Sequence, residues 1–162
     1  MLAQRYEKRL FNYAWRTLGD EEAAFDIVQE SFLAAYKSLG KFKGRSSFFT
    51  WLYAIARNKT ITVLRERKRH PPHVSTQHDE EMDIPDKRPN PVRSAVLNET
   101  QKRIQAAIAE LDDDYREAIV LREIEGCSYL EICEITGWDM PTVKTRIHRA
   151  RLQLREKLRD LL

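Results

Sequence analysis

Apolar residues recur every three or four positions along most of this chain, and that spacing predicts amphipathic helices. We expect a first helix from about Gln4 to Leu18, where Gly19 interrupts the pattern, and a second that reaches about Leu39. A third helix is expected to start after Ser46 or Ser47 and to end in the basic run 65–69. No convincing alternation of polar and apolar residues, the pattern of a strand, occurs. The sequence therefore predicts an all-α fold.

The predicted second helix has two different faces. Its inward stripe is expected to consist of Phe25, Val28, Phe32, Ala35, Tyr36 and Leu39. The opposite face carries Asp26, Gln29, Glu30, Leu33 and Lys37. On the residues alone, the favoured interpretation of that opposite face is a solvated polar surface.

Residues 70–93 differ in composition from the rest of the chain. Between His70 and Pro91 lie five of the six prolines, no glycine and a cluster of acidic residues. Such a segment cannot build a core and is typical of an extended linker. We therefore expect two small helical domains, 1–69 and 94–162, joined by a linker at 70–93. The histidines in this segment are not expected to bind a metal, because scattered ligands lack a preorganised geometry.

The second predicted domain contains the pattern of a helix-turn-helix. Ser128 and Glu131 form an S-x-x-E capping box, Gly137 ends a short helix, and Pro141 fits an early position of a longer one, with Asp139 or Met140 as its cap. In that motif the second helix enters the major groove of DNA. The side chains expected to reach bases or phosphates are Thr142, Lys144, Thr145, Arg146, His148, Arg149 and Arg151. Those expected to face the core are Val143, Ile147, Ala150 and Leu154.

Charge supports a nucleic-acid partner only locally. The chain carries 28 basic and 25 acidic residues, for a net charge of +3, but residues 141–162 hold seven basic residues against two acidic ones.

The absence of an apolar run of about 20 residues argues against a membrane span, and no secretory signal is visible, so we expect a cytoplasmic protein. No catalytic motif, cofactor fingerprint or metal-ligand spacing occurs, and we expect neither an enzyme nor a cofactor.

The stretch from Lys41 to Asn58 combines aromatic and basic residues around a glycine. Its aromatic residues are Phe42, Phe48, Phe49, Trp51 and Tyr53, and its basic residues are Lys41, Lys43, Arg45 and Arg57. Unpaired bases stack on aromatic rings at ~1–3 kcal/mol each while cations follow the phosphates, so this stretch is typical of a surface for single-stranded nucleic acid. An alternative stays open, because Phe48, Leu52 and Ile55 also have the spacing of a buried helical stripe.

Two long stretches together carry a resemblance to a known family. One is residues 26–60, with D-x-x-Q-E-x-F and F-x-x-x-S-x-F-x-T-W-L-Y, and the other is residues 115–158, with the helix-turn-helix. The chain resembles a bacterial RNA polymerase sigma factor of the extracytoplasmic-function group. This resemblance implies that the protein directs core RNA polymerase to specific promoters, and it favours a functional role for the polar face of the second helix.

The resemblance also implies roles for individual residues. Contacts to the clamp helices of the polymerase's largest subunit would come from Asp26, Gln29, Glu30, Phe32, Leu33 and Lys37. Capture of the melted minus-ten non-template strand would involve Lys41, Phe42, Lys43, Gly44, Arg45, Ser46, Ser47, Phe48, Trp51, Tyr53, Arg57 and Asn58. The helix from Thr142 would read the minus-thirty-five element, and its domain would rest on the flap of the second-largest subunit. An anti-sigma factor is a further expected partner.

Two other functions remain as alternatives. One is a stand-alone helix-turn-helix regulator that binds an operator, although it leaves the aromatic and basic stretch unexplained. The other is a thiol or metal sensor that uses Cys127, Cys133 and the histidines of the linker. By default, we expect Cys133 to be a small core residue.

Overall fold

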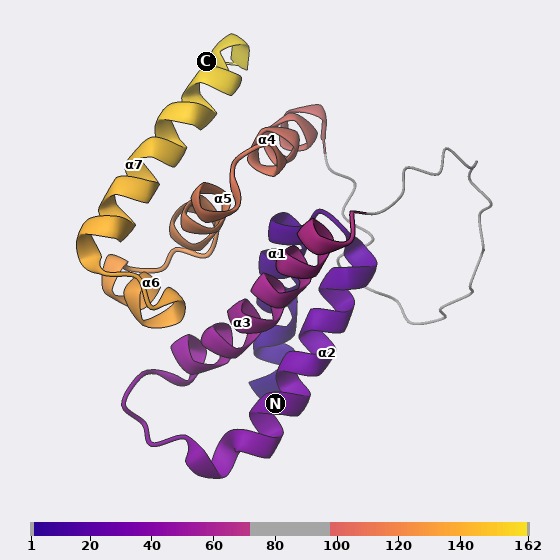
Figure 1. The fold of residues 1–162 in the computed structure, drawn as a ribbon, viewed down its shortest axis with the longest axis vertical. Helices are drawn as coiled ribbons and strands as arrows, with labels where there is room; N and C mark the ends of the chain where they lie inside the picture. Colours follow the sequence, from indigo (N-terminus) through magenta and orange to yellow (C-terminus); the bar gives the residue numbers. More distant parts are fainter. Residues whose placement is uncertain (1, 72–97, 162) are drawn as a thin grey trace, which may run out of the picture.

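A computed structural model describes residues 2–71 and 98–161 of the chain, and within these ranges every regular element is a helix (Figure 1). The all-α prediction is confirmed. The predicted linker falls almost entirely outside the described residues. No helix in the described part of the chain is both long enough and apolar enough to cross a membrane.

The first half of the chain is a bundle of three helices, α1 (Leu2–Leu18), α2 (Glu21–Ser38) and α3 (Phe48–Arg69), with a short 3-10 turn, η1 (Leu39–Lys41), after α2. Local chemistry sets where these helices begin. The Asp20 carboxylate accepts a hydrogen bond from the backbone N–H of Glu22 at 2.9 Å, and the Ser47 hydroxyl accepts one from the N–H of Thr50 at 3.1 Å. The prediction that Ser46 or Ser47 caps the third helix is therefore confirmed, with Ser47 as the cap.

The predicted inward stripe of α2 is wrong in part. Phe25, Tyr36 and Leu39 are exposed to 38%, 80% and 52%. The buried side of α2 consists of Ala24, Ile27, Val28, Ser31 and Ala35. Small side chains on this side let α2 lie close against α1, so the larger aromatic side chains are turned outward.

The second half consists of α4 (Glu99–Ala109), α5 (Asp113–Ile119), a π-helical turn η2 (Val120–Ile124), α6 (Tyr129–Thr136), α7 (Met140–Lys157) and a final 3-10 turn η3 (Arg159–Leu161). The capping box at Ser128 is formed as predicted. Gly137 ends α6 with a φ of 77°, which an L side chain adopts only with strain. Asp139 caps α7 by accepting a hydrogen bond from the N–H of Thr142 at 2.8 Å. These elements form the predicted helix-turn-helix.

The two halves pack against each other. The ribbon view shows α6 beside the first half of α3, and α4 and α5 beside α1, with α7 along the outer edge (Figure 1). Polar contacts join the two halves at several points: Arg16 donates a hydrogen bond to the side-chain oxygen of Gln105 at 2.9 Å, and Arg116 donates one to the carbonyl of Thr17 at 3.2 Å. This packing determines which of the predicted binding residues are accessible.

Candidate nucleic-acid interface

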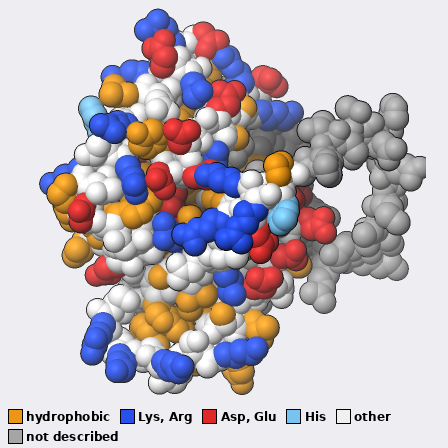
Figure 2. All heavy atoms as spheres, viewed as in Figure 1, with side chains coloured by type: hydrophobic (Ala, Val, Ile, Leu, Met, Phe, Trp, Pro, Cys, Tyr) orange, Lys and Arg blue, Asp and Glu red, His pale blue; other side chains and the backbone are white. Residues whose placement is uncertain are grey.

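The loop between α2 and α3 presents basic side chains next to a cluster of aromatic rings. Lys41, Lys43 and Arg45 are exposed. The rings of Phe42 and Trp51 lie 4.9 Å apart between centroids, and both contact the ring of Phe48, at 6.1 and 5.7 Å. In the space-filling view, the lower end of the molecule shows a hydrophobic patch with Lys and Arg side chains around it (Figure 2). Half-buried rings of this kind can offer a face to an unpaired base while remaining fixed by their neighbours.

The other predicted minus-ten residues divide between this surface and the interior. Gly44, Ser47 and Asn58 are exposed, and Ser46 is half-buried. Tyr53 does not lie on this surface, because its side chain is fully buried and its hydroxyl donates a hydrogen bond to Glu125 Oε2 at 2.7 Å. Arg57 is half-buried and points at the second half of the chain. Spacing within a helix could not distinguish these two residues from their exposed neighbours, because their partners lie in another domain.

The predicted polymerase-binding face lies on the outside of α2. Five of its residues are exposed: Asp26, Gln29, Glu30, Leu33 and Lys37. Phe32 is half-buried and packs against the core, so most of its side chain contributes to the packing of α2. The exposed rings of Phe25 and Tyr36 add apolar area to the outer surface of the helix.

Helix α7 has a buried and an exposed side, as predicted. Val143, Ile147 and Ala150 are buried. Exposed on the opposite side are Lys144, Thr145, His148, Arg149 and Arg151, and Thr142 and Arg146 are half-buried. Two of the cations are already paired: Arg151 Nε donates to Glu123 Oε1 at 2.6 Å, and Arg146 Nη2 lies 3.2 Å from Asp114 Oδ2.

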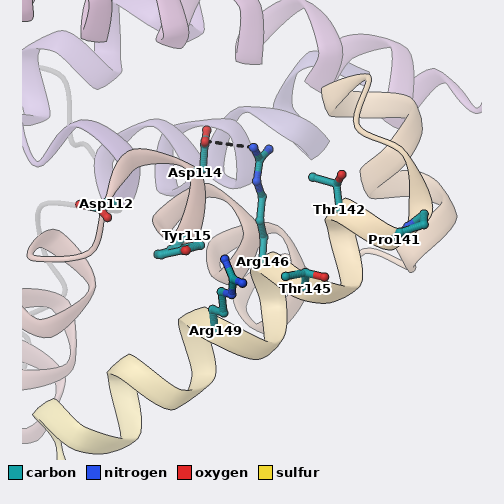
Figure 3. Close-up of a pocket in the computed structure, with 8 residues that line it drawn as sticks. All are labelled: Asp112, Asp114, Tyr115, Pro141, Thr142, Thr145, Arg146 and Arg149. Atoms are coloured by element: carbon teal, nitrogen blue, oxygen red, sulfur yellow. Dashed lines mark ion pairs between the residues drawn. The ribbon is translucent and has the colours of Figure 1, made fainter.

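A cavity of about 460 Å³ opens between the start of α5 and the first turns of α7. Its lining residues are Asp112, Asp114, Tyr115, Pro141, Thr142, Thr145, Arg146 and Arg149. Figure 3 shows the Arg146 side chain extending from α7 across this space to Asp114. The cavity thus brings carboxylates of α5 next to cations of the helix that is predicted to contact DNA.

Two acidic side chains of the second half, Glu117 of α5 and Glu125 after η2, accept hydrogen bonds from the first half of the chain. Glu117 Oε1 accepts hydrogen bonds from Arg57 Nε at 2.8 Å and from the hydroxyl of Tyr13 at 3.3 Å. Glu125 accepts the hydroxyl of Tyr53, and its carboxylate lies 3.5 Å from Arg9 Nε.

The donors to these two acids repeat at a spacing of four residues. Arg9 and Tyr13 are one turn apart on α1, and Tyr53 and Arg57 are one turn apart on α3. Each acid therefore meets one tyrosine and one arginine, and each pair of donors combines both helices. Local sequence patterns could not predict this constellation, because its partners lie 60 to 116 positions apart along the chain.

Burial at this contact perturbs the ionisation of its groups. Removal from water raises the pKa of the Glu117 carboxyl, although the Arg57 guanidinium opposes the shift. Burial likewise raises the pKa of Glu125, against the opposing effects of Tyr53 and Arg9. The pKa of the Tyr13 hydroxyl is raised well above its usual value, first by burial and then by the charge of Glu117.

The cysteines and histidines form no further site in the described part of the chain. Cys127 is buried, Cys133 is half-buried and both are free thiols. Burial raises the pKa of Cys127 to about 12. Within residues 2–71 and 98–161, no group of His, Cys, Asp and Glu side chains is arranged to hold a metal ion. His73 and His78 of the linker lie outside the described residues.

Comparison with known proteins identifies both halves of this arrangement. Residues 2–70 match the family model "Sigma-70 region 2", and residues 101–154 match "Sigma-70, region 4". The chain is 35% identical to the RNA polymerase sigma-H factor of Pseudomonas aeruginosa, over all of this chain and 86% of that protein. It is 38% identical to the ECF RNA polymerase sigma factor SigW of Bacillus subtilis, over 96% and 86% of the two chains.

A solved structure agrees with these matches. The sigma factor RpoE of Bartonella quintana, crystallised with the anti-sigma factor NepR, superposes with a TM-score of 0.75 at 28% identity, over 96% of this chain and 93% of that one. The fold and these matches thus define a promoter-specificity factor of RNA polymerase. The chain belongs to the sigma-70 family, in its extracytoplasmic-function group, and directs promoter-specific transcription initiation.

Proposed function

We propose that this sigma factor binds core RNA polymerase through the outer face of α2, captures the melted minus-ten strand with the 41–47 loop and the start of α3, and reads the minus-thirty-five duplex with α7. The observation that carries the proposal is the pair of exposed surfaces, one aromatic and basic and the other a basic helix-turn-helix, on the two halves that match regions 2 and 4. We take 1–69 and 94–162 as the two domains and 70–93 as their linker.

The outer face of α2 has the composition of a protein interface. Leu33 is 55% exposed, with Gln29 and Glu30 beside it on the same surface. Exposed apolar side chains within a polar surround are typical of a protein contact, where the apolar centre is desolvated and the charged rim orients the partner. The clamp helices of the polymerase's largest subunit are the partner that we propose for this face.

The loop from Lys41 to Ser47 and the first turns of α3 suit a strand whose bases are unpaired. Its rings are available for stacking only if the bases have left the duplex, so binding here draws on energy that also opens DNA. Lys41, Lys43 and Arg45 would contact the phosphates on either side. Intact duplex is a poor ligand for this surface, because its base faces are buried.

The side chains of α7 suit duplex DNA. Lys144, Thr145, His148 and Arg149 form one exposed row at the N-terminal half of the helix, the part that enters the major groove in a helix-turn-helix. The domain that carries α7 would rest on the flap of the second-largest polymerase subunit. A stand-alone operator-binding regulator is not favoured, because it gives no role to the region 2 half.

Two further partners follow from the family and its surfaces. Since the Bartonella quintana sigma factor was solved with an anti-sigma factor, we propose that an anti-sigma factor also binds this chain. Because the proposed partners, core RNA polymerase and promoter DNA, lie in the bacterial cytoplasm, we propose a cytoplasmic location. The proposed activity needs no cofactor and no chemical step by the sigma factor itself.

The proposal is tested with purified chain and core RNA polymerase. The variant is Gln29→Ala combined with Leu33→Ala, two exposed changes on α2. Glu7→Ala combined with Lys8→Ala is the matched control, because both residues are exposed on α1, for which no polymerase contact is proposed. We expect the α2 variant to weaken binding to the polymerase and the control to leave it unchanged.

Strand opening is measured on the same complexes by permanganate reactivity of thymines. The promoters are selected from a random DNA pool by the polymerase complex itself. Reactive thymines near minus ten, lost in the α2 variant, are the expected result. No binding to polymerase, together with tight binding of the free chain to intact duplex, would refute the proposal and support an operator-binding regulator.

A further inference from the structure

Two arginines assigned above to DNA binding, one from each half of the chain, converge on a single indole ring. The Arg57 guanidinium carbon lies 5.8 Å from the centre of the Trp138 ring, and that of Arg146 lies 4.3 Å from it. Trp138 belongs to the turn between α6 and α7. The packed arrangement thus brings a minus-ten residue and a minus-thirty-five residue to the same place, where both are engaged by protein.

Both arginines are also held by acidic side chains of α5. Glu117 pairs with Arg57 at 2.8 Å, and Asp114 pairs with Arg146 at 3.2 Å. Glu117 is only 2% exposed, and Arg57 donates a further hydrogen bond to the carbonyl of Thr136 at 3.2 Å. Arg57 is therefore inserted between α5 and the end of α6, where DNA phosphates cannot reach it.

The remaining contacts close the interface on either side. Tyr53, also assigned to the minus-ten set, is fully buried with its hydroxyl on Glu125. At the rim, Lys68 Nζ at the end of α3 lies 2.9 Å from Asp113 Oδ2 at the start of α5. Separating a buried ion pair leaves an unpaired charge in an apolar surface unless the whole interface opens. Such a pair therefore favours the packed arrangement over others.

We propose that this packing is a self-inhibited state, in which the acidic side chains of α5 and the Trp138 ring hold Arg57 and Arg146 away from promoter DNA. The two halves must separate before either arginine can contact a promoter. This inference depends on the assignment of both arginines under the proposed function. Because only the open fraction of molecules can bind, the apparent dissociation constant of the free chain equals its intrinsic value divided by that fraction.

The principal test variant is Glu117→Ala in the full chain. It leaves Arg57 and the hydroxyl of Tyr13 without their buried acceptor. Hydrogen bonds to charged groups are strong enough that losing this acceptor should change the ratio of closed to open molecules by about tenfold or more. Glu110→Ala is the control, because Glu110 is an exposed acid of the same domain and its loss changes the net charge equally.

Closure and DNA binding are measured separately. Closure is read as the yield of the Lys68–Asp113 cross-link formed by a water-soluble carbodiimide, quantified by mass spectrometry, since that amine and carboxylate are 2.9 Å apart. DNA binding is read by fluorescence anisotropy with a duplex whose minus-ten segment is unpaired. We expect Glu117→Ala to lower the cross-link yield and to raise the affinity for this DNA about tenfold or more, with Glu110→Ala matching the unchanged chain.

A second variant, Lys68→Glu, guards against misfolding of the first. Lys68 is 76% exposed, so replacing it should not disturb the fold of the chain. The new carboxylate would face Asp113 and Asp114. Charge alone predicts weaker binding to DNA, because two units of positive charge are removed. Self-inhibition predicts the opposite, a rise in affinity together with a larger radius of gyration in small-angle scattering.

Either of two results would overturn the inference. One is loss of the cross-link or expansion of the chain with no gain in DNA affinity, which would show that closure hides nothing. The other is a chain that remains closed in both variants, which would show that these contacts do not hold it. Transcription by each variant with core polymerase is recorded in parallel, so a failure of the proposed function shows as no transcript from any variant, including the unchanged chain.

Discussion

Exposed arginines on α7 should differ in their contribution to promoter binding according to the partners they already have. Among the described residues Arg149 has no ion-pair partner, whereas Arg151 Nε donates to Glu123 at 2.6 Å. A bidentate contact from arginine to guanine contributes ~1–3 kcal/mol, so we expect Arg149→Ala to weaken binding about 5- to 150-fold. Arg151 must first leave an exposed ion pair that is worth ~0.2–1 kcal/mol, and Arg151→Ala should therefore cost correspondingly less.

The assay is fluorescence anisotropy of the polymerase complex on a labelled duplex that contains the minus-thirty-five element, at several salt concentrations. A residue that contacts only phosphate should lower the slope of log affinity against log salt by about one and weaken all sequences alike. A residue that contacts a base should also relax discrimination at one position. Equal losses for the two variants, or a larger loss for Arg151→Ala, would refute the ranking derived from the Glu123 pair.

Three further results are expected. Ile147→Ala removes a fully buried side chain from α7 and should lower the free energy of unfolding by ~2–5 kcal/mol, measured by urea denaturation, with an unchanged value arguing against its place in the core. A thiol reagent at about pH 8 should modify Cys133 well before Cys127, whose pKa is raised to about 12 by burial, as peptide mapping would show. Burial raises the pKa of Glu117 and Glu125, so the packed state binds protons more tightly than an open one. Small-angle scattering should therefore show that the closed state becomes more populated as the pH falls from about 8 to about 5. This pH dependence should be weaker in Glu117→Gln.

Helix boundaries were predictable from the sequence because their causes are local. Asp20, Ser47 and Ser128 cap their helices through hydrogen bonds to backbone groups two or three residues away. Gly137 ends α6 because its own backbone conformation requires it. Such interactions leave a signature within four residues of sequence, and so the helix-turn-helix could be identified before its tertiary packing was known.

The orientation of α2 was less predictable. A stripe at positions 25, 28, 32 and 36 and one at positions 24, 27, 31 and 35 fit the helical period equally well. Side-chain size favoured the first stripe as the buried one, because that stripe carries the aromatic residues. Packing selected the second together with Val28, because Ala24, Ser31 and Ala35 permit a closer approach to α1 and thereby leave Phe25 and Tyr36 on the surface.

The contact between the two halves could not be predicted, because it depends on an irregularity within one helix. In an uninterrupted α-helix Glu125 would point about 80° away from Glu117 around the axis, and the two could not meet donors stacked one turn apart on α1 and α3. The π turn takes up an extra residue, with the N–H of Glu125 bonded to the carbonyl of Val120, five residues back, at 3.0 Å. That wider turn reduces the angle between the two carboxylates and directs both toward the first domain. The π turn therefore lets Glu125 engage Tyr53 beside the pair of Glu117 and Arg57, and the burial of both donors depends on the second domain and not on the sequence of their own helix.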